Sequence, residues 1–391
     1  MQERWATNVK NTMQDSPSKN DLKAIALYLP QFHPFKENDE WWGKGFTEWT
    51  NVTKSKPKFE GHYQPHLPAD LGFYDLRLLD TMVDQAKLAM EYGVYGFCFY
   101  HYWFNGKLLM ETPVEQMLKS KKPDFPFCLC WANENWTRTW DGLEKNVLIK
   151  QDYDLKDDLD HIQYLMPFFK DDRYIKIDGK PVYLMYRSEL HPNINQAVHI
   201  WREEVKKQGF EDLYLIRVEN FKRNFDPVNH DFDASMEFAP DFSLELQKYS
   251  KKKPIRHFLR KLSHKTGIAS SGLLKNKVFD YQDMVDRMVA KEPKSYKFFR
   301  SVFPSWDNSA RRAKDATVFV NSSPEKFKQW VIKTADYTNR NFNGDERMMF
   351  INAWNEWAEG CHLEPDQKYG HQYLQALKEG LDAVKINSHK E

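Results

Sequence analysis

Two glutamates near the carboxyl end of the chain, Glu356 and Glu359, have the residue type and surroundings that glycoside chemistry requires. They lie three residues apart in the motif WNEWAEG (354–360), directly after the apolar run 348–351. Apolar surroundings and a like-charged neighbour can hold the proton on one carboxyl while the other stays ionised, which separates an acid role from a base role at neutral pH. The flanking indoles can stack on the apolar face of a sugar ring. We therefore predict that the pair is catalytic, in preference to an ordinary exposed pair on a turn.

The elements that must position this pair follow a repeating pattern. Eight strand-like runs alternate with helix-like segments over most of the chain, and only the connection 220–233 lacks a helical pattern. This alternation predicts an α/β fold, a (β/α)8 TIM barrel with long strand-to-helix loops, with a doubly wound open sheet as the alternative. The predicted strands are 24–29, 95–100, 127–131, 182–186, 213–218, 234–238, 298–303 and 348–353. The predicted helices are 76–92, 113–121, 155–169, 195–208, 281–290, 324–338 and 371–384.

Chemistry in such a barrel gathers at the carboxyl ends of the strands, where this chain carries mostly polar and aromatic residues. On the last strand, alternation predicts that Asn352, Trp354 and Glu356 point toward the barrel mouth. Glu359 joins Glu356 only if the chain turns after Glu356, and Gly360 offers a flexible point for such a turn. The residues predicted to bind substrate are Gln31, His33, Trp42, Glu48, Trp49, His62, Tyr63, Tyr100, His101, Trp103, Trp131, Asn133, Glu134, Asn135, Trp136, Arg138, Arg187, Glu219, Glu237, Trp306, Trp354 and Asn355.

Some of these residues have a structural alternative. The tryptophans of segment 40–51, which lies in a long first strand-to-helix loop, form either a sugar-binding wall or a small core that closes the loop on itself. For His101, a structural role and a role in binding sugar are equally favoured. The indoles, amides and arginine of segment 131–140 favour sugar binding, because amides and guanidinium can bond hydroxyls while the rings stack.

Composition restricts the class of protein. The 391 residues suffice for a barrel with insertions, and the net charge of +1 argues against a surface built as a whole for nucleic acid. Aromatic residues make up 15% of the chain, and many stand beside polar residues, which favours an aromatic-lined cleft. Residues 1–20 are polar and no apolar run reaches 18 residues, so we expect a cytoplasmic protein with a flexible segment 1–20 and a single barrel domain, 21–391.

No cofactor and no metal is predicted. The chain has neither a Rossmann or Walker phosphate loop nor a Gly-x-Ser-x-Gly elbow. His362, Glu364 and Asp366 stand close in sequence, but on an irregular segment that sets no defined coordination. The four cysteines lie in or just after apolar runs, and we expect free, buried thiols at Cys98, Cys128, Cys130 and Cys361.

A basic insertion at about 246–278 is the other unusual segment. From residue 248 to residue 277 it contains lysines and arginines but no acidic residue, and 255–262 has helical apolar spacing. It is interpreted either as solvated surface or as a short amphipathic helix that contacts an anionic membrane or a phosphate-bearing, lipid-linked glycan. No nucleic-acid motif accompanies the charge.

Six motifs together resemble the WbsX-like proteins of surface-polysaccharide loci, which are often labelled glycosyltransferases. The resemblance extends from residue 24 to about 377, and a looser one links the chain to the endo-α-mannosidases of glycoside hydrolase family 99. The motifs are YLPQFHP (28–34), WWG (41–43), FTEW (46–49), YGF (95–97), CWANENW (130–136) and WNEWAEG (354–360).

The resemblance to the mannosidases implies a mechanism. Glu356 matches the carboxylate that deprotonates the sugar 2-hydroxyl, so that a 1,2-anhydro sugar forms, and Glu359 matches the acid that protonates the leaving oxygen. The implied activity is a retaining glycoside hydrolase acting on an α-linked surface polysaccharide, mannose-containing chains among them, or on a lipid-linked precursor. Ala358 stands where the mannosidase pattern has histidine. The alternatives are a glycosyltransferase of O-antigen or capsular polysaccharide assembly and a glycan-binding barrel without catalysis.

Overall fold

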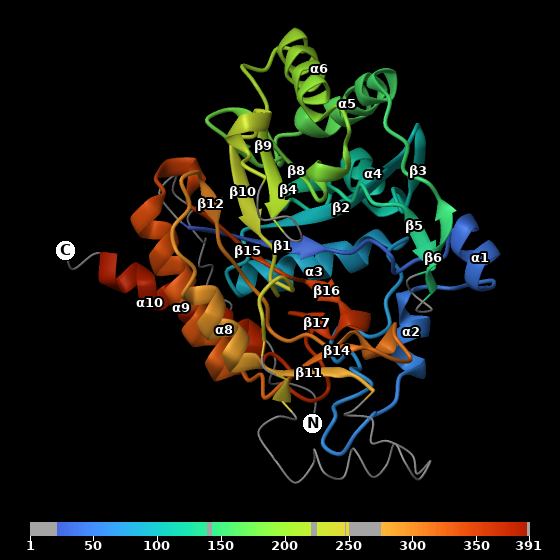
Figure 1. Ribbon diagram of the computed structural model, residues 1–391, viewed down its shortest axis with the longest axis vertical. Helices are drawn as coiled ribbons and strands as arrows, with labels where there is room; N and C mark the ends of the chain where they lie inside the picture. Colours follow the sequence, from blue (N-terminus) through green and yellow to red (C-terminus); the bar gives the residue numbers. More distant parts are fainter. Residues whose placement is uncertain (1–21, 139–142, 220–224, 247, 250–274, 389–391) are drawn as a thin grey trace, which may run out of the picture.

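The computed structural model describes residues 22–138, 143–219, 225–246, 248–249 and 275–388 (Figure 1). The predicted N-terminal segment 1–20 and most of the predicted basic insertion, 250–274, lie outside the described residues. Within the described part of the chain, no helix is long and apolar enough to cross a membrane. The cytoplasmic location and the division into domains stay predictions.

A parallel β-barrel forms the centre of the molecule (Figure 1). Its strands run in the order β12-β10-β9-β8-β4-β2-β1-β15-β13. Because β12 pairs with β10 and β13 pairs with β15, two pieces of one short segment link the ends of the sheet and close the barrel. The strands are β1 (Lys23–Tyr28), β2 (Gly96–Phe104), β4 (Phe127–Trp131), β8 (Lys180–Met185), β9 (Tyr214–Glu219), β10 (Ala234–Glu237), β12 (Phe298–Phe299), β13 (Ser301–Val302) and β15 (Met348–Ile351).

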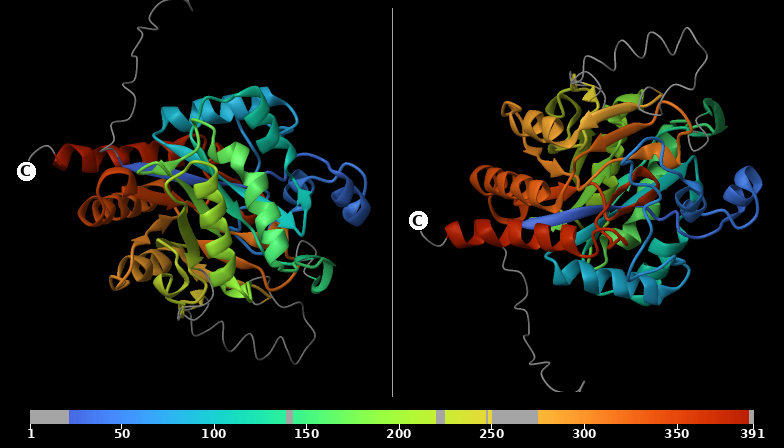
Figure 2. Two further views of the ribbon diagram at one scale, coloured as in Figure 1. Left: turned by 90° about the horizontal axis from the view of Figure 1, so that it is seen from above. Right: turned by 90° about the horizontal axis from the view of Figure 1, so that it is seen from below.

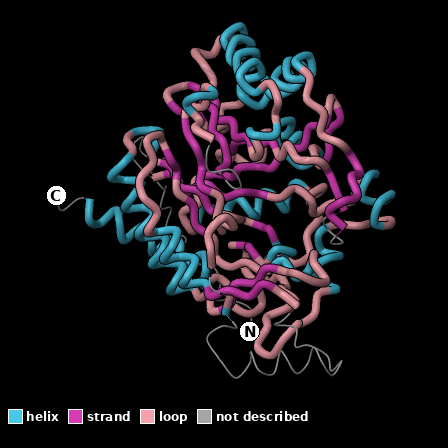
Figure 3. Tube along the Cα trace, viewed as in Figure 1, coloured by secondary structure: helices cyan, strands magenta, loops and turns pink. Residues whose placement is uncertain are grey.

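Helices surround the strands, as the views of Figures 2 and 3 show. Three of them begin at a polar residue that the sequence places just before an apolar period: Asp154, Asp280 and Ser323 each accept a hydrogen bond from a backbone N–H of the first helical turn. The helices are α3 (Leu79–Glu91), α4 (Thr112–Ser120), α5 (Leu155–Phe169), α6 (Ile194–Lys207), α8 (Tyr281–Val289), α9 (Pro324–Asn341) and α10 (Gln372–Ser388). In the described part of 220–233, only a 3-10 turn occurs.

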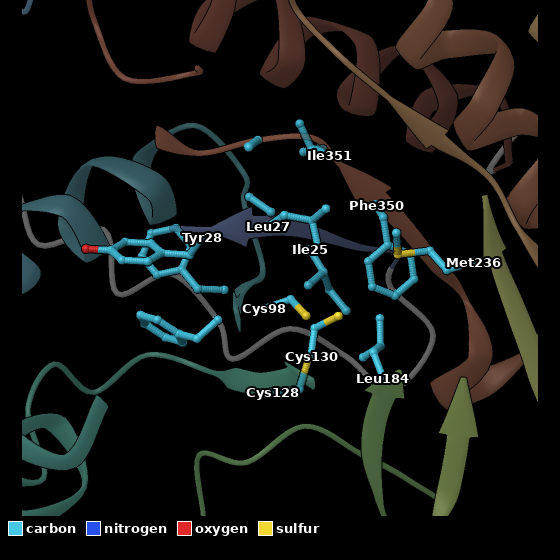
Figure 4. Packing of buried hydrophobic residues seen from close by; sticks show 14 of the residues in the cluster. Ile25, Leu27, Tyr28, Cys98, Cys128, Cys130, Leu184, Met236, Phe350 and Ile351 are labelled. Carbon is cyan, nitrogen blue, oxygen red and sulfur yellow. The ribbon is translucent and has the colours of Figure 1, made fainter. Parts of the chain in front are cut away.

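The barrel interior is filled by apolar side chains (Figure 4). Ile25 and Leu27 of β1 face Cys98, Leu184 and Phe350 from other strands, and all five are buried. Strands covered by helices outside and side chains inside are buried on both faces, which explains their near-continuous apolar runs. The four cysteines are free and buried, as predicted.

Smaller elements occupy segments in which the sequence analysis predicted only loops. Segment 40–51 was predicted to be a loop, but it contributes to two short helices, because Thr47 forms a capping box with Thr50 and the following residues bury one face. These helices are α1 (Lys36–Trp42) and α2 (Glu48–Lys54). The additional strands are β3 (Lys107–Leu109), β5 (Trp136–Arg138), β6 (Leu143–Ile149), β7 (Lys176–Ile177), β11 (Lys277–Asp280), β14 (Thr317–Val320), β16 (Asn355–Glu356) and β17 (Cys361–His362).

Candidate active site

A cavity of about 530 Å³ lies at the carboxyl ends of the barrel strands. Ala132, Tyr186 and Phe238 line it, and each is the residue directly after the end of a strand, namely β4, β8 and β10. Its volume falls within the range of about 300–1,000 Å³ that is usual for small-molecule sites. The other lining residues are Leu29, Tyr100, Tyr102, Glu134, Asn135, Trp136, Thr137, Phe242, Lys277, Trp306, Asn308, Arg311, Arg312, Asp315, Thr317, Glu356 and Glu359.

A tight turn, residues 356–360, brings the two predicted catalytic glutamates to this cavity together, and it is called the catalytic turn after that prediction. Glu356 ends β16, a 3-10 turn covers Trp357–Glu359, and Gly360 follows with a φ of 55°. A Cβ at Gly360 would lie 3.0 Å from the Cβ of Asp307, so glycine meets both the left-handed conformation and the lack of space. The chain turns after Glu356, as the sequence analysis required for the two carboxyls to meet.

Arg311 binds three carboxylates at once. Its Nη2 donates to Glu356 Oε2 at 2.7 Å, its Nη1 lies 2.6 Å from Glu359 Oε1, and its Nε donates to Glu48 Oε1 at 2.9 Å. Glu48, the first residue of α2, is completely buried. The planar guanidinium therefore fixes the carboxyls of the β16 turn relative to a third carboxyl from the first strand-to-helix loop.

The electrostatics of the three carboxyls around Arg311 favour retention of a proton on Glu359. Burial raises the pKa of Glu359 to about 8, and the charges of Glu356 and Glu48 add to this effect while Arg311 opposes it. Burial likewise raises the pKa of Glu48 to about 7, again against the influence of Arg311. One guanidinium cannot balance three carboxylates, so the raised pKa of Glu359 favours its protonated form at neutral pH, the form that a general acid needs.

Aromatic rings and polar groups form the remaining walls. Tyr100, Trp136 and Trp306 line the cavity and offer flat apolar surfaces to a ligand. On the same wall Glu134 forms an ion pair with Arg187, and Asn135 accepts a hydrogen bond from the backbone N–H of Gln151 at 2.7 Å. The combination can stack on a sugar ring and bond its hydroxyls.

Most residues predicted to bind substrate do not line the cavity. Seven of the predicted site residues do line it, and Glu48 adjoins it through Arg311. The seven are Tyr100, Glu134, Asn135, Trp136, Trp306, Glu356 and Glu359. The predicted residues that do not line it are Gln31, His33, Trp42, Trp49, His62, Tyr63, His101, Trp103, Trp131, Asn133, Arg187, Glu219, Glu237, Trp354 and Asn355. The side chain of Arg138 lies outside the described residues.

Several of these residues are instead held inside the barrel wall. His101 Nε2 lies 2.9 Å from Nε2 of His161, so the structural alternative applies to His101. Trp103 donates to Asp157, and Trp131 and Trp354 are at most 1% exposed. Tyr100 and Tyr102 of β2 line the cavity, whereas His101 and Trp103, which alternate with them, contact α5. These two side chains therefore lie on the strand face opposite to the cavity.

Other strand-end residues are bound by polar groups elsewhere. Glu219 accepts from the Tyr296 hydroxyl at 2.6 Å, and Glu237 forms an ion pair with Lys291 at 2.7 Å. Asn355 bonds both backbone groups of Leu29, at 2.8 and 3.0 Å, and thereby ties β16 to the end of β1.

Backbone groups take part in the contacts of the remaining residues of the first loop and of the third strand end, while the Gln31 side chain is buried without a hydrogen-bond partner. The backbone carbonyl of Gln31 accepts from Glu48, and His33 Nδ1 lies 2.9 Å from the carbonyl of Pro30. Asn133 donates to the carbonyl of Arg187 at 2.8 Å. These contacts shape the loops that carry the cavity residues.

The tryptophans of the first loop form packing contacts. Trp42 stacks on Phe46, Trp41 packs near Trp136, and Trp49 packs against Trp357 of the catalytic turn. Trp42 thus packs within the segment, whereas Trp41 and Trp49 pack against residues of other segments. The role of these tryptophans in binding sugar stays a prediction.

Sequence reasoning missed Arg311, which follows a short 3-10 turn, Asn308–Ala310. Its neighbour Arg312 also lines the cavity, so two adjacent arginines after a predicted strand were the available signal. The missed residues also include Tyr102, Tyr186, Phe238 and Asn308, all of which lie within a few residues of a predicted strand end.

Asp307 connects the catalytic turn to the first loop. Its backbone N–H donates to the carbonyl of Glu359 at 2.5 Å. Its carboxylate receives His62 Nε2 at 2.6 Å and the Gln64 amide at 2.7 Å. His62 and Gln64 therefore position the backbone of Glu359 indirectly, through Asp307.

Comparison with known proteins gives consistent relatives. The family profile described as Glycosyltransferase WbsX matches residues 24–377. Two proteins named "Uncharacterized protein WxcX", from Xanthomonas campestris pv. campestris strains B100 and ATCC 33913, are 42% and 41% identical over 357 residues. Each match covers 91% of this chain and 49% of the relative, so the chain spans about half the length of the curated relatives it matches.

Solved structures share the fold. A "Glycoside hydrolase-like protein" superposes with a TM-score of 0.58 at 15% identity, over 93% of this chain and 94% of the other. The GH99 endo-α-mannosidase from Bacteroides thetaiotaomicron superposes with a TM-score of 0.54 at 13% identity, over 94% and 98%. This likeness concerns the fold, and the predicted α/β barrel is confirmed. The match over residues 24–377 establishes that the chain belongs to the glycosyltransferase WbsX family.

Proposed function

We propose that this chain is a retaining glycoside hydrolase that cleaves an α-linked surface polysaccharide, mannose-containing chains among them, or a lipid-linked precursor. The observation that carries the proposal is the contact of one partly buried guanidinium, Arg311, with Glu48, Glu356 and Glu359 beside an aromatic-lined cavity. An acid and a base fixed by the same group are what glycoside cleavage needs.

In the first step, Glu356 takes the proton of the sugar 2-hydroxyl. The 2-oxygen then attacks the anomeric carbon, the glycosidic bond breaks, and Glu359 gives its proton to the leaving oxygen. The product of this step is a 1,2-anhydro sugar, and Glu359 is left ionised. The raised pKa of Glu359 supports its role as the proton donor, because the group still holds its proton at neutral pH.

In the second step, ionised Glu359 takes a proton from water, and the water oxygen attacks the anomeric carbon. The bond between that carbon and the 2-oxygen breaks, and Glu356 returns its proton to the 2-oxygen. Two inversions give net retention without a covalent bond to the protein. Arg311 keeps the guanidinium charge next to both carboxyls while their protonation changes.

A glycosyltransferase is the second candidate. The family description supports it, and so do Lys277 and Arg312, whose side chains line the cavity and carry the positive charge that a sugar diphosphate requires. The acceptor sugar would then take the place of water in the second step.

The test is mass spectrometry of the protein incubated with a panel of α-linked oligosaccharides, with and without nucleotide sugars. The proposal expects shortened chains without nucleotide from the wild type, and none from Glu356→Gln or Glu359→Gln. The matched control is Glu379→Gln on α10, an exposed glutamate that does not line the cavity, which should cleave like the wild type.

Three outcomes would overturn the proposal. Chains that lengthen only when nucleotide sugar is present would make the protein a transferase. Binding without any turnover by the wild type would make it a glycan-binding barrel. Undiminished cleavage by both catalytic variants would remove the roles given to Glu356 and Glu359.

A further inference from the structure

A second group of chemically active side chains lies outside the cavity. His66 comes from the segment between α2 and α3, His362 from β17, and Asp366 from the segment between β17 and α10. All three are buried, and one ligand atom of each lies within 4.8 Å of those of the other two. None of the three lines the catalytic cavity.

Hydrogen bonds aim these groups at one another. His362 Nδ1 lies 2.9 Å from the carbonyl of Glu364, which accepts its proton and leaves Nε2 with a free lone pair. That Nε2 lies 3.0 Å from His66 Nδ1 and 3.9 Å from Asp366 Oδ2. A ring N–H that donates to a backbone carbonyl while the other nitrogen faces outward is the usual orientation of a metal-ligating histidine.

The carboxylate is oriented in the same manner. Asp366 Oδ1 accepts the backbone N–H groups of Lys368 and Tyr369, at 3.0 and 2.6 Å. Its Oδ2 is thereby directed at the two imidazoles and accepts a hydrogen bond from the Tyr63 hydroxyl at 3.2 Å. Ligating carboxylates are held by such outer bonds.

The space between these groups suits a single ion. A pocket of about 20 Å³ is lined by His66, His362 and Asp366 together with neighbouring side chains, and about 10–15 Å³ is enough for one water-sized sphere. Ligand atoms in a tetrahedral zinc site stand about 3.3 Å apart. The separations of 3.0 and 3.9 Å lie on either side of that value, so small side-chain rotations reach it.

We propose that His66, His362 and Asp366 form a zinc site with three protein ligands, with the pocket supplying the fourth position to water. Two imidazoles and one carboxylate suit zinc, whereas magnesium prefers a shell of oxygens. The sequence analysis predicted no metal because His66 lies 296 residues before His362 and brings the ligand that the local motif lacks.

The site would fasten the first loop to the catalytic turn. The His362 ring stacks on the Trp357 ring with centroids 3.8 Å apart, and Trp357 lies between the two catalytic glutamates. His66 belongs to the same loop as His62, which holds Asp307 against the backbone of Glu359. A metal ion would therefore stabilise the supports of the catalytic turn without taking part in the reaction.

The test is made on full-length protein purified without a histidine tag. After dialysis against a chelator, the Tm is measured with Zn²⁺, with Mg²⁺ and without added metal, and bound zinc is counted by elemental analysis. The proposal expects about one zinc ion per chain and a rise in Tm of about 3–6 °C with Zn²⁺ but not with Mg²⁺.

Variants separate this site from other histidines. His66→Gln and Asp366→Asn should each lose the zinc and the rise in Tm. His371→Gln should keep both, because His371 pairs with Asp70 at the surface without a second imidazole. An unchanged Tm and no bound zinc in the wild type would show that His66 and His362 simply share a hydrogen bond. A zinc-dependent rise in Tm that persists in both site variants would place the metal elsewhere. Either result overturns the proposal.

Discussion

The burial of Glu359 predicts that the catalytic turn lowers the stability of the fold at neutral and alkaline pH. The perturbation is Glu359→Gln, which keeps the shape of the side chain but cannot ionise. In the folded protein the pKa of Glu359 is raised by burial to about 8, against an ordinary value of 4.5. The effect on stability follows from this difference by linkage.

The ionisation of Glu359 makes the free energy of unfolding fall as the pH rises above 4.5. Below pH 4.5 both the folded and the unfolded chain hold the proton, so Glu359 makes no pH-dependent difference there. Between pH 4.5 and 8 the unfolded chain ionises first, so stability falls by about 1.4 kcal/mol for each pH unit. The total at pH 8 is about 3–5 kcal/mol, which Glu359→Gln should recover.

The assay is denaturant unfolding of both proteins at pH 5, 6.5 and 8, followed by circular dichroism. The variant should exceed the wild type by less than about 1 kcal/mol at pH 5 and by an increasing margin as pH rises. Glu379→Gln is the control: Glu379 is exposed and its pKa is lowered by hydrogen bonds from Gln375 and Lys328, so its loss should bring no gain at pH 8. A Glu359→Gln protein that is less stable at pH 8, or better by the same margin at every pH, would refute the reasoning.

Three further predictions concern activity on a cleavable α-glycoside. First, kcat/KM should fall as pH rises through about 8, because Glu359 loses the proton that it gives to the leaving group; a pH–rate profile that stays flat to pH 9 would contradict this. Second, Arg311→Lys should lower kcat by about 10²-fold or more, since an ammonium cannot bind Glu48, Glu356 and Glu359 in one plane; steady-state kinetics check it, and near-wild-type kcat would show that the guanidinium is dispensable. Third, Trp306→Ala should raise KM by about 5–30-fold through loss of a stacking surface, with kcat little changed; an unaffected KM would remove Trp306 from the binding wall.

The fold was predictable because its signals are local. All eight predicted strands occur, and α5 has the predicted bounds, since apolar runs and polar caps such as Asp154 act over a few residues. The seventh predicted strand is split into β12 and β13 around Arg300, whose guanidinium donates to the carbonyls of Met288 and Lys291. Nothing in the sequence around Arg300 indicated that the strand would break there.

The candidate site was predictable only in part, because its geometry depends on loops. Glu356 and Glu359 could be paired from their own motif and from Gly360. Arg311 could not be paired with its partners, because the turn before it shows no helical or strand-like spacing of apolar residues. Its three partners are spread along the sequence from Glu48 to Glu359. A strand-end position tells which end of the barrel a residue occupies but not which face of the strand carries it. Trp131 was therefore placed in the site, although its ring packs against His161 of α5 and Trp201 of α6.

The most direct test of the central claim compares two α-glycosides that differ only at the 2-position of the sugar next to the cleaved bond. One carries a free hydroxyl and the other a 2-O-methyl group, and release of the leaving group is followed for both. If Glu356 acts on the 2-hydroxyl and Glu359 on the leaving oxygen, the free sugar is cleaved and the methylated sugar is bound without cleavage. Cleavage of both at similar rates would contradict the account, because it would show that the 2-oxygen takes no part in the reaction.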